Sequence, residues 1–242
     1  MRRVLGAISF LTIFPTGGNP APPGESAIFF PLVGAILGAA GAGIFLGLAR
    51  LLPLSIAALV VVAFWAAISG VLHEDGLADS ADAFRAGRSR EKMAAILKDS
   101  RIGTYGAVAI VLSVVARWQA VEHIYGINIF AAFVAAQAVP RAAMVALAWV
   151  SRPAGSGLGH AFAATLTTPA ALLAAAQGIA ASFACGVRPG LTIVLGSYLI
   201  LRLAQFYFYR RIGGVNGDCL GAAEQILEIF ILVLFTCRAC SW

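Results

Sequence analysis

Long runs of apolar residues alternate with short polar segments along this chain of 242 residues. A helix needs about 20 apolar residues to cross a hydrocarbon layer of about 30 Å, and several of the runs reach that length. The pattern predicts seven membrane-spanning helices, at residues 28–49, 51–72, 105–121, 127–150, 170–187, 190–209 and 221–236. Some of these runs are short or contain Gly and Pro, so seven is a best count of the spans.

The first apolar run, residues 4–14, is too short to span and leads into a stretch rich in Pro and Gly. With the arginines before it, the run imitates a secretory signal peptide. A signal peptide also needs a cleavage site of small residues, and no clean one follows. We therefore expect a short interfacial or re-entrant segment at the N-terminus.

Composition supports the prediction of a membrane protein. The chain is 60% apolar and only 12% charged, and its mean hydropathy is +0.89, far outside the range of soluble globular proteins. The four cysteines offer no zinc site, because the C-x-x-C at residues 237–240 lacks two further ligands nearby. We expect one all-α membrane domain over residues 1–242, a polytopic helical bundle.

The positive residues are distributed unequally between the two sides of this predicted bundle. Eleven lie on the side of the loop at 73–104 and three on the other, which indicates that this loop is cytoplasmic. The eleven are Arg2, Arg3, Arg85, Arg88, Arg90, Lys92, Lys98, Arg101, Arg152, Arg210 and Arg211. The same topology brings the loops 73–104, 151–169 and 210–220 to one face. It also explains the net charge of +6 without nucleic acid.

Within the first of these loops, the sequence predicts a short amphipathic helix. Ser89 is a suitable N-cap, and Met93, Ile96 and Leu97 follow the i, i+3, i+4 spacing of an apolar helix face. We expect this helix to dock on the bundle or lie on the membrane surface.

The acidic residues are concentrated in the same loop. Only 11 occur in the chain, and six of them lie between Glu74 and Asp99. Asp75, Asp79 and Asp82 are spaced i, i+4, i+7, which places three carboxylates within about 60° on one helix face. Such carboxylates repel one another and favour a divalent cation. The alternative is a solvated acidic turn between two helices.

A second acidic segment is brought to the same face by the topology. Asp218 lies in a turn with four glycines, residues 213–221, whose backbone can approach a ligand closely. A glycine-rich connection between helices is the alternative. Glu228 lies deeper in the last span and should face the bundle interior. Glu224 is closer to the interface, where the helix dipole accounts for it.

Cationic residues near these carboxylates are candidates for phosphate binding. Lys98 and Arg101 share a helix face at the start of a span, although juxtamembrane anchoring explains them too. Arg141 lies in the middle of a span, where a charge is usually functional or paired. Arg117 and Arg202 lie nearer span ends, so snorkelling of their side chains to the interface explains them.

His73 adjoins the acidic segment where a span ends. An imidazole at this point is able to ligate a metal, act as a base, or form a hydrogen bond at the interface. The sequence leaves these three roles open.

Taken in chain order, these motifs resemble the cobalamin synthase family, also called adenosylcobinamide-GDP ribazoletransferase. The matching segments are F-L-T with Pro15 (10–15), F-P-L-V-G (30–34), the D-G-L-A-D segment (73–82), K-D-S-R-I-G-T (98–104), Arg141, G-L-G (157–159), and G-D-x-L-G-A (217–222) with Gln225 and Glu228. Two residues depart from the family pattern: Glu74 replaces an uncharged residue, and Asn216 stands where threonine is common.

The resemblance implies an integral protein of the bacterial inner membrane that uses Mg²⁺. It implies the last assembly step of vitamin B12 synthesis, in which adenosylcobinamide-GDP reacts with alpha-ribazole or its 5′-phosphate and GMP leaves. In such a displacement the protein mainly positions the reactants and neutralises charge. Lipid is then a partner, and assembly into a homo-oligomer stays open.

On this hypothesis the site residues take specific roles. Asp79 is expected to be essential for turnover, and either His73 or Glu228 is the general base for the incoming hydroxyl. The expected metal ligands are Asp75, Asp79, Asp82 and Asp218, and the expected phosphate-binding residues are Lys98, Arg101 and Arg141.

Two other functions use the same features. Intramembrane charges such as Arg141 and Glu228, with spans broken by Gly and Pro, are also typical of transporters. Spaced aspartates with Mg²⁺ also suit another membrane alcohol phosphotransferase. The location of the polar groups distinguishes a transporter from an enzyme, because transport needs polar groups along a route through the membrane. Only tests with different substrates distinguish another alcohol phosphotransferase from the proposed enzyme.

Overall fold

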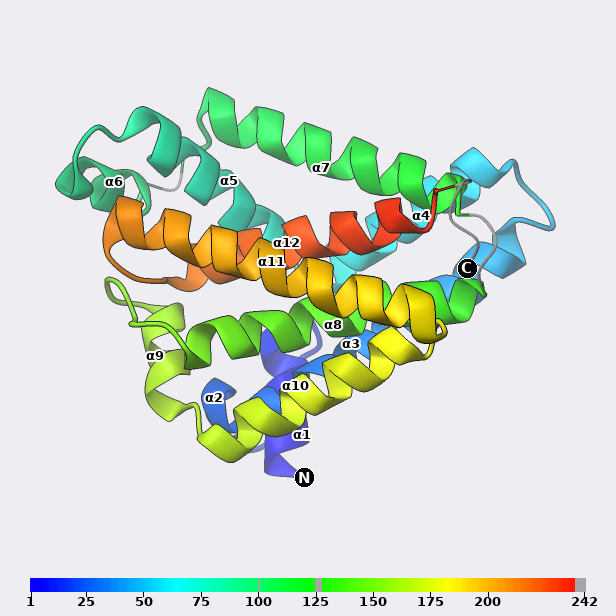
Figure 1. Ribbon diagram of the computed structural model, residues 1–242, viewed down its shortest axis with the longest axis horizontal. Helices are drawn as coiled ribbons and strands as arrows, with labels where there is room; N and C mark the ends of the chain where they lie inside the picture. The colour runs from blue at the N-terminus through cyan, green and yellow to red at the C-terminus, as the bar shows by residue number, and fades with distance from the viewer. Residues whose placement is uncertain (100, 125–127, 238–242) are drawn as a thin grey trace.

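The protein is a bundle of helices (Figure 1). The computed structural model describes residues 1–99, 101–124 and 128–237, and over these residues it contains no strand beyond an isolated bridge between Pro153 and Val215. The helices are α1 (Arg2–Leu11), α2 (Pro23–Ser26), the 3-10 helix η1 (Ala27–Phe29), α3 (Phe30–Leu48), α4 (Leu54–Ile68), α5 (Leu72–Ala86), α6 (Arg90–Ile96), α7 (Thr104–Glu122), α8 (Ile129–Trp149), α9 (Leu158–Thr165), α10 (Thr168–Phe183), α11 (Val187–Ile212) and α12 (Gly217–Leu234). The predicted all-α fold is confirmed.

The predicted count of seven spans is not confirmed. Within the described residues, four helical segments are long and apolar enough to cross a membrane: Pro23–Leu48, α7, α8 and α11. The pairs α4–α5 and α9–α10 qualify only together, and they bend by 85° and 102°. The prediction for 51–72 missed the first bend, which falls at Gly70 and Val71, both with positive φ. The structure thus has four to six candidate spans.

Helix α12, predicted as the seventh span, lies inside the bundle. It packs against α5, α7 and α8 (Figure 1). It carries Asp218, Glu224 and Glu228, more charge than an apolar span tolerates. Because neighbouring helices surround α12, its carboxylates face protein instead of lipid.

Helix α8 forms the other half of the core, between α3, α10 and α12. Small residues allow this close packing, as is common between membrane helices. A Cβ at Gly34 of α3 would clash with the carbonyl oxygen of Gln137, and one at Gly38 would clash with that of Phe133. These crossings fix α3 on α8 and hold Arg141 within the interior.

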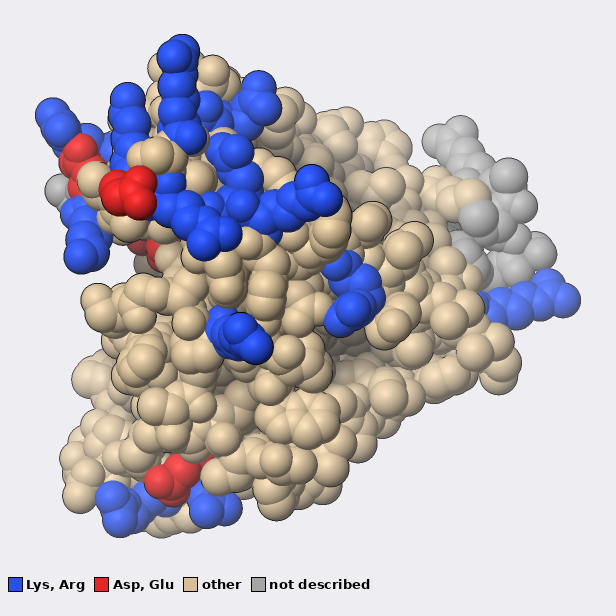
Figure 2. Space-filling model, turned by 60° about the vertical axis from the view of Figure 1, so that its left-hand side comes forward, with Lys and Arg blue, Asp and Glu red and all other residues tan. Residues whose placement is uncertain are grey.

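Two short helices lie in the segments for which the sequence predicts a non-spanning N-terminal segment and an amphipathic helix after Ser89. Helix α1 is ten residues long, too short to span, and it packs against α2 and α3. Helix α6 begins after Ser89, whose side chain accepts a hydrogen bond from the Lys92 amide, and it buries Met93. Figure 2 shows Lys and Arg side chains gathered at the end of the molecule where α6 lies.

Candidate active site

Helices α5 and α12 cross at two glycines, and this crossing positions the acidic residues. A Cβ on Gly76 would lie 3.0 Å from the carbonyl oxygen of Asp218 and 3.2 Å from the Cα of Gly221. Only glycine therefore allows this approach without a shift of the backbone. The crossing brings Asp75, one residue before Gly76, to the N-terminal turn of α12, which carries Asp218.

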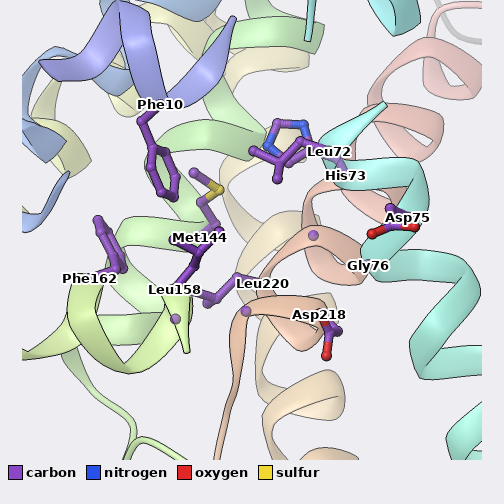
Figure 3. A pocket seen from close by; sticks show the side chains of 13 residues that line it. Phe10, Leu72, His73, Asp75, Gly76, Met144, Leu158, Phe162, Asp218 and Leu220 are labelled. Atoms are coloured by element: carbon purple, nitrogen blue, oxygen red, sulfur yellow. The ribbon is translucent and has the colours of Figure 1, made fainter. Parts of the chain in front are cut away.

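A cavity of about 660 Å³, partly open to solvent, lies at this crossing. Figure 3 shows Phe10, Phe162 and Met144 on one side of it and Asp75 and Asp218 on the other. We call this the acidic cavity. Its lining comes from α1, α5, α8, α9 and α12, so segments far apart in the sequence meet here.

A third helix is held at the crossing by another pair of glycines. A Cβ on Gly159 of α9 would clash with the backbone nitrogen of Gly217. The G-L-G and G-D segments are therefore in direct backbone contact, which places the start of α9 against the start of α12. This contact closes the cavity on the side of Leu158 and Phe162.

A second cavity, of about 700 Å³, shares Asp218 with the first. Its lining includes Arg90 of α6, Lys98, and Asn216, whose amide donates a hydrogen bond of 2.7 Å to Asp218. We call it the basic cavity. Cations on one side of Asp218 and carboxylates on the other suit a ligand that carries phosphate groups and a bound cation.

The four predicted metal ligands have different surroundings. Asp75 is exposed, and Asp79 and Asp218 are half-buried. None of these three carboxylates forms an ion pair with a described residue. The charges of Asp75, Asp218 and Asp82 all act on Asp79, so the four are electrostatically one group. No three His, Cys, Asp or Glu side chains among the described residues already stand in metal-binding positions.

Asp82 is engaged by the protein itself. Its carboxylate accepts hydrogen bonds of 2.7 Å from the Gly103 amide and 2.9 Å from the Gly106 amide, at the start of α7. A Cβ on either glycine would clash with the Asp82 carboxylate. Asp82 thus supplies, from another helix, the cap that the α7 N-terminus lacks. Its predicted role as a metal ligand stays a prediction.

Deeper in the bundle lies a group of buried ionisable side chains that contact one another. We call it the buried charge network; its members are His73, Glu74, Arg117, Arg141, Glu224 and Glu228. Arg117 Nη1 is 2.9 Å from Glu74 Oε1 and 3.5 Å from Glu228 Oε1, and the Arg117 side chain is only 1% exposed. Snorkelling is therefore the wrong explanation for Arg117, because its guanidinium turns inward to carboxylates of α5 and α12. Hydropathy places a residue along its span but does not say which neighbours its side chain meets.

The other half of the network contains His73 and Arg141. Arg141 Nη1 is 3.0 Å from Glu224 Oε1, and His73 Nδ1 is 3.3 Å from Glu224 Oε2. Glu224 is fully buried between them, so the helix dipole at an interface does not account for it. His73 also lines the acidic cavity, and its buried Nε2 atom has no hydrogen-bond partner among the described residues. Glu228 lines none of the described cavities.

The three predicted phosphate-binding cations are separated. Lys98 lines the basic cavity, whereas Arg141 lies in the buried charge network. The Arg101 side chain is 87% exposed and forms a 2.7 Å ion pair with Asp99, whose pKa its hydrogen bonds lower to about 2. The structure therefore does not bring Arg101 to either cavity. Arg90, absent from the predicted set, takes a place there instead.

Comparison with known proteins identifies the family to which this arrangement belongs. A sequence profile described as cobalamin-5-phosphate synthase matches residues 3–236. The chain belongs to the cobalamin-5-phosphate synthase family. It is 36% identical to the adenosylcobinamide-GDP ribazoletransferase of Ralstonia pickettii, over 93% of this chain and 91% of the relative. The protein of the same name from Bradyrhizobium diazoefficiens is 39% identical, over 94% and 90%.

A third relative comes from another bacterium. A Clostridium botulinum adenosylcobinamide-GDP ribazoletransferase is 32% identical, over 87% of this chain and 86% of its own. No solved structure matches the chain. In this member of the cobalamin-5-phosphate synthase family, each of five motifs behind the sequence resemblance contributes lining residues to at least one of the two cavities: those at 10–15, 73–82, 98–104, 157–159 and 217–222.

Proposed function

We propose that this protein transfers the phosphocobinamide group of adenosylcobinamide-GDP to alpha-ribazole or its 5′-phosphate, with release of GMP. Family membership over nearly the whole chain supports this assignment over a transporter or another phosphotransferase. The structural observation that carries it is the junction of the acidic and basic cavities at Asp218. A diphosphate placed at that junction has cations on one side and unpaired carboxylates on the other.

The residues present fit a magnesium ion. Asp75, Asp79 and Asp218 form no ion pair with a described residue, and Asp75 and Asp218 line the cavities that meet at the proposed diphosphate position. Asp79 lines neither cavity, but the charges of Asp75 and Asp218 act on it. Mg²⁺ commonly takes only one or two carboxylates, with phosphates and water as its other ligands, so a complete cage of protein ligands is not required. When bound, it would neutralise the charge that builds up on the phosphate oxygens.

The protein's own groups account for the rest of the reaction. Lys98 and Arg90 hold the phosphate oxygens of the donor in the basic cavity. A ribose hydroxyl of the acceptor attacks the phosphorus attached to cobinamide, and the bond from that phosphorus to the GMP oxygen breaks. Of the two predicted bases we assign His73, because it lines the acidic cavity, whereas Glu228 lines none of the described cavities and is engaged with Arg117.

We place the protein in the bacterial inner membrane with this site on the cytoplasmic face. The apolar helices support a membrane location. The clustering of Lys and Arg around α6, beside the basic cavity, supports the orientation (Figure 2). The variants Arg88→Cys, near α6, and Leu51→Cys, after α3, test this orientation when they are labelled with a reagent that does not cross the membrane. Residue 88 should react only from the cytoplasmic side and residue 51 only from the opposite side.

The deciding experiment measures GMP release by the purified protein in lipid nanodiscs. Adenosylcobinamide-GDP and alpha-ribazole 5′-phosphate are supplied with Mg²⁺, with EDTA, and with EDTA followed by excess Mg²⁺. We expect GMP and cobalamin phosphate to form in equal amounts, to stop with EDTA and to resume with Mg²⁺. A folded sample that releases no GMP in any condition would contradict the proposed activity. Equal rates with and without EDTA would contradict the metal assignment alone.

A further inference from the structure

The side of the acidic cavity opposite the carboxylates is an aromatic wall. Phe10 of α1, Phe30 of α3 and Phe162 of α9 form a stacked cluster. Their ring centroids lie 5.4 to 6.1 Å apart, and their planes are inclined by 12° to 18°. Phe10 and Phe162 reach the cavity, where Met144 adjoins them (Figure 3). We call Phe10, Phe162 and Met144 the aromatic wall.

The two sides of the cavity differ sharply in polarity. No side chain of the aromatic wall has a hydrogen-bond donor or a strong acceptor, whereas Asp75, Asp218 and His73 line the other side. A ligand that fills this space has an apolar flat part next to a polar part that reaches the carboxylates. A nucleoside whose base lacks polar edge groups has this form.

We propose that the aromatic wall binds the base of the acceptor nucleoside, and that its residues set the preference among lower-ligand bases. This inference rests on the proposed function and adds a substrate subsite to it. The dimethylbenzimidazole ring of alpha-ribazole is flat and apolar, and it packs well on aromatic side chains and Met. With the ring on this wall, the attached ribose extends toward Asp75 and Asp218, where its hydroxyl must react.

The other large groups of the two substrates fit this wall less well. Guanine also has a flat face, but it presents donors and acceptors along its edges, and the aromatic wall supplies no partner for them. The corrin ring is much wider than a wall formed by three side chains. The wall also gives a role to α1, a ten-residue helix too short to span the membrane, since this helix supplies Phe10.

The test substitutes Phe10 and measures the two substrates separately. Phe10→Ala removes one face of the wall and should raise the KM for alpha-ribazole 5′-phosphate about tenfold, the effect of losing one aromatic contact. The KM for adenosylcobinamide-GDP should stay within about twofold of the wild-type value, as expected for a contact that only the acceptor makes. Phe10→Leu keeps the bulk but not the flat ring, so its KM for alpha-ribazole 5′-phosphate should lie between the values of the wild type and of Phe10→Ala. This variant also keeps the test valid if the alanine variant misfolds.

Phe29→Ala is the matched control. Phe29 is half-buried like Phe10 and packs against the same core, but it does not line the cavity. Its KM values should match those of the wild type. The acceptor series should also include an alpha-riboside 5′-phosphate with a purine base, which Phe10→Ala should penalise less than the dimethylbenzimidazole compound.

Other results would overturn the inference. A rise in the KM for adenosylcobinamide-GDP alone would assign the wall to the donor. Unchanged KM values in Phe10→Ala and Phe10→Leu, or equal rises with Phe29→Ala, would show that the wall is only structural. The wild-type protein is assayed in parallel, so failure of the proposed function, with no turnover at all, is distinguished from failure of the subsite.

Discussion

Two groups of carboxylates lie on the same pair of helices and have opposite surroundings. Glu74 of α5 and Glu228 of α12 are buried and contact Arg117. Asp75 and Asp218, on the same two helices, line a cavity and have no basic partner among the described residues. The glycine crossing lies between these environments, so adjacent residues such as Glu74 and Asp75 point to different ones.

The difference shows how one helix pair serves both stability and chemistry. A buried charge is tolerated only with a partner, so the arginines of the buried charge network tie α5, α7, α8 and α12 together. Carboxylates that already had arginine partners would bind a cation weakly. The acidic cavity keeps its carboxylates free because the neighbouring network supplies the structural support.

The largest expected effect comes from the cavity side of this comparison. Asp218→Asn removes the charge shared by both cavities and should lower GMP release about a thousandfold, the upper range for losing one charge-stabilising group in an active site. The apparent melting temperature in detergent should stay within about 2 °C, because Asp218 has no ion pair to lose. Activity near the wild-type level would refute its role.

The largest loss of stability is expected from a substitution in the buried charge network. Arg117→Met leaves Glu74 and Glu228 buried without their partner and should destabilise the fold by about 3–5 kcal/mol. Thermal unfolding in detergent measures it. The triple variant Arg117→Met, Glu74→Gln, Glu228→Gln removes the stranded charges and should recover much of the loss. If the single variant is as stable as the wild type, the network has no structural role.

Substitution at the crossing itself should affect both groups. Gly76→Ala places a Cβ 3.0 Å from the carbonyl oxygen of Asp218, so α5 and α12 must move apart by a few tenths of an ångström. We expect about a tenfold to hundredfold loss of activity, since active sites are sensitive to small displacements, and about 1–3 kcal/mol of destabilisation. Gly43→Ala on α3, where the Cβ meets no atom within 4 Å, is the control and should change neither.

Features of the site that depend on residue spacing along the chain could be predicted from the sequence. Features that depend on contacts between helices could not. The side assigned to Asp218 was enough to predict that it lies near Asp75, and the two line one cavity, whereas Asp79, four residues after Asp75, does not line it. The partner of Asp82 was not predictable, because it depends on how closely Gly103 and Gly106 approach from another helix.

The same reasoning applies to the arginines. Distance from a span end suggested that Arg117 snorkels, and a helix face shared with Lys98 suggested that Arg101 binds phosphate, but neither pattern fixes the direction of a side chain. Arg117 meets two carboxylates only because α5 and α12 pack beside α7. Phe10 stands in the F-L-T segment, but nothing in the sequence pairs it with Phe162, because the two residues are far apart along the chain and meet only in the folded protein.

The smallest expected effect separates Lys98 from Arg101, two cations that the sequence treats alike. Lys98 lines the basic cavity beside Asp218, and Lys98→Ala should raise the KM for adenosylcobinamide-GDP about tenfold through loss of one phosphate contact. Arg101→Ala removes only an exposed pair with Asp99, so the same KM should stay within about twofold. Equal effects of the two variants, in the same nanodiscs and at one salt concentration, would mean that long-range attraction by the whole basic surface holds the donor. Because such attraction weakens with salt more than a contact in the cavity does, a salt titration of both variants decides between these explanations.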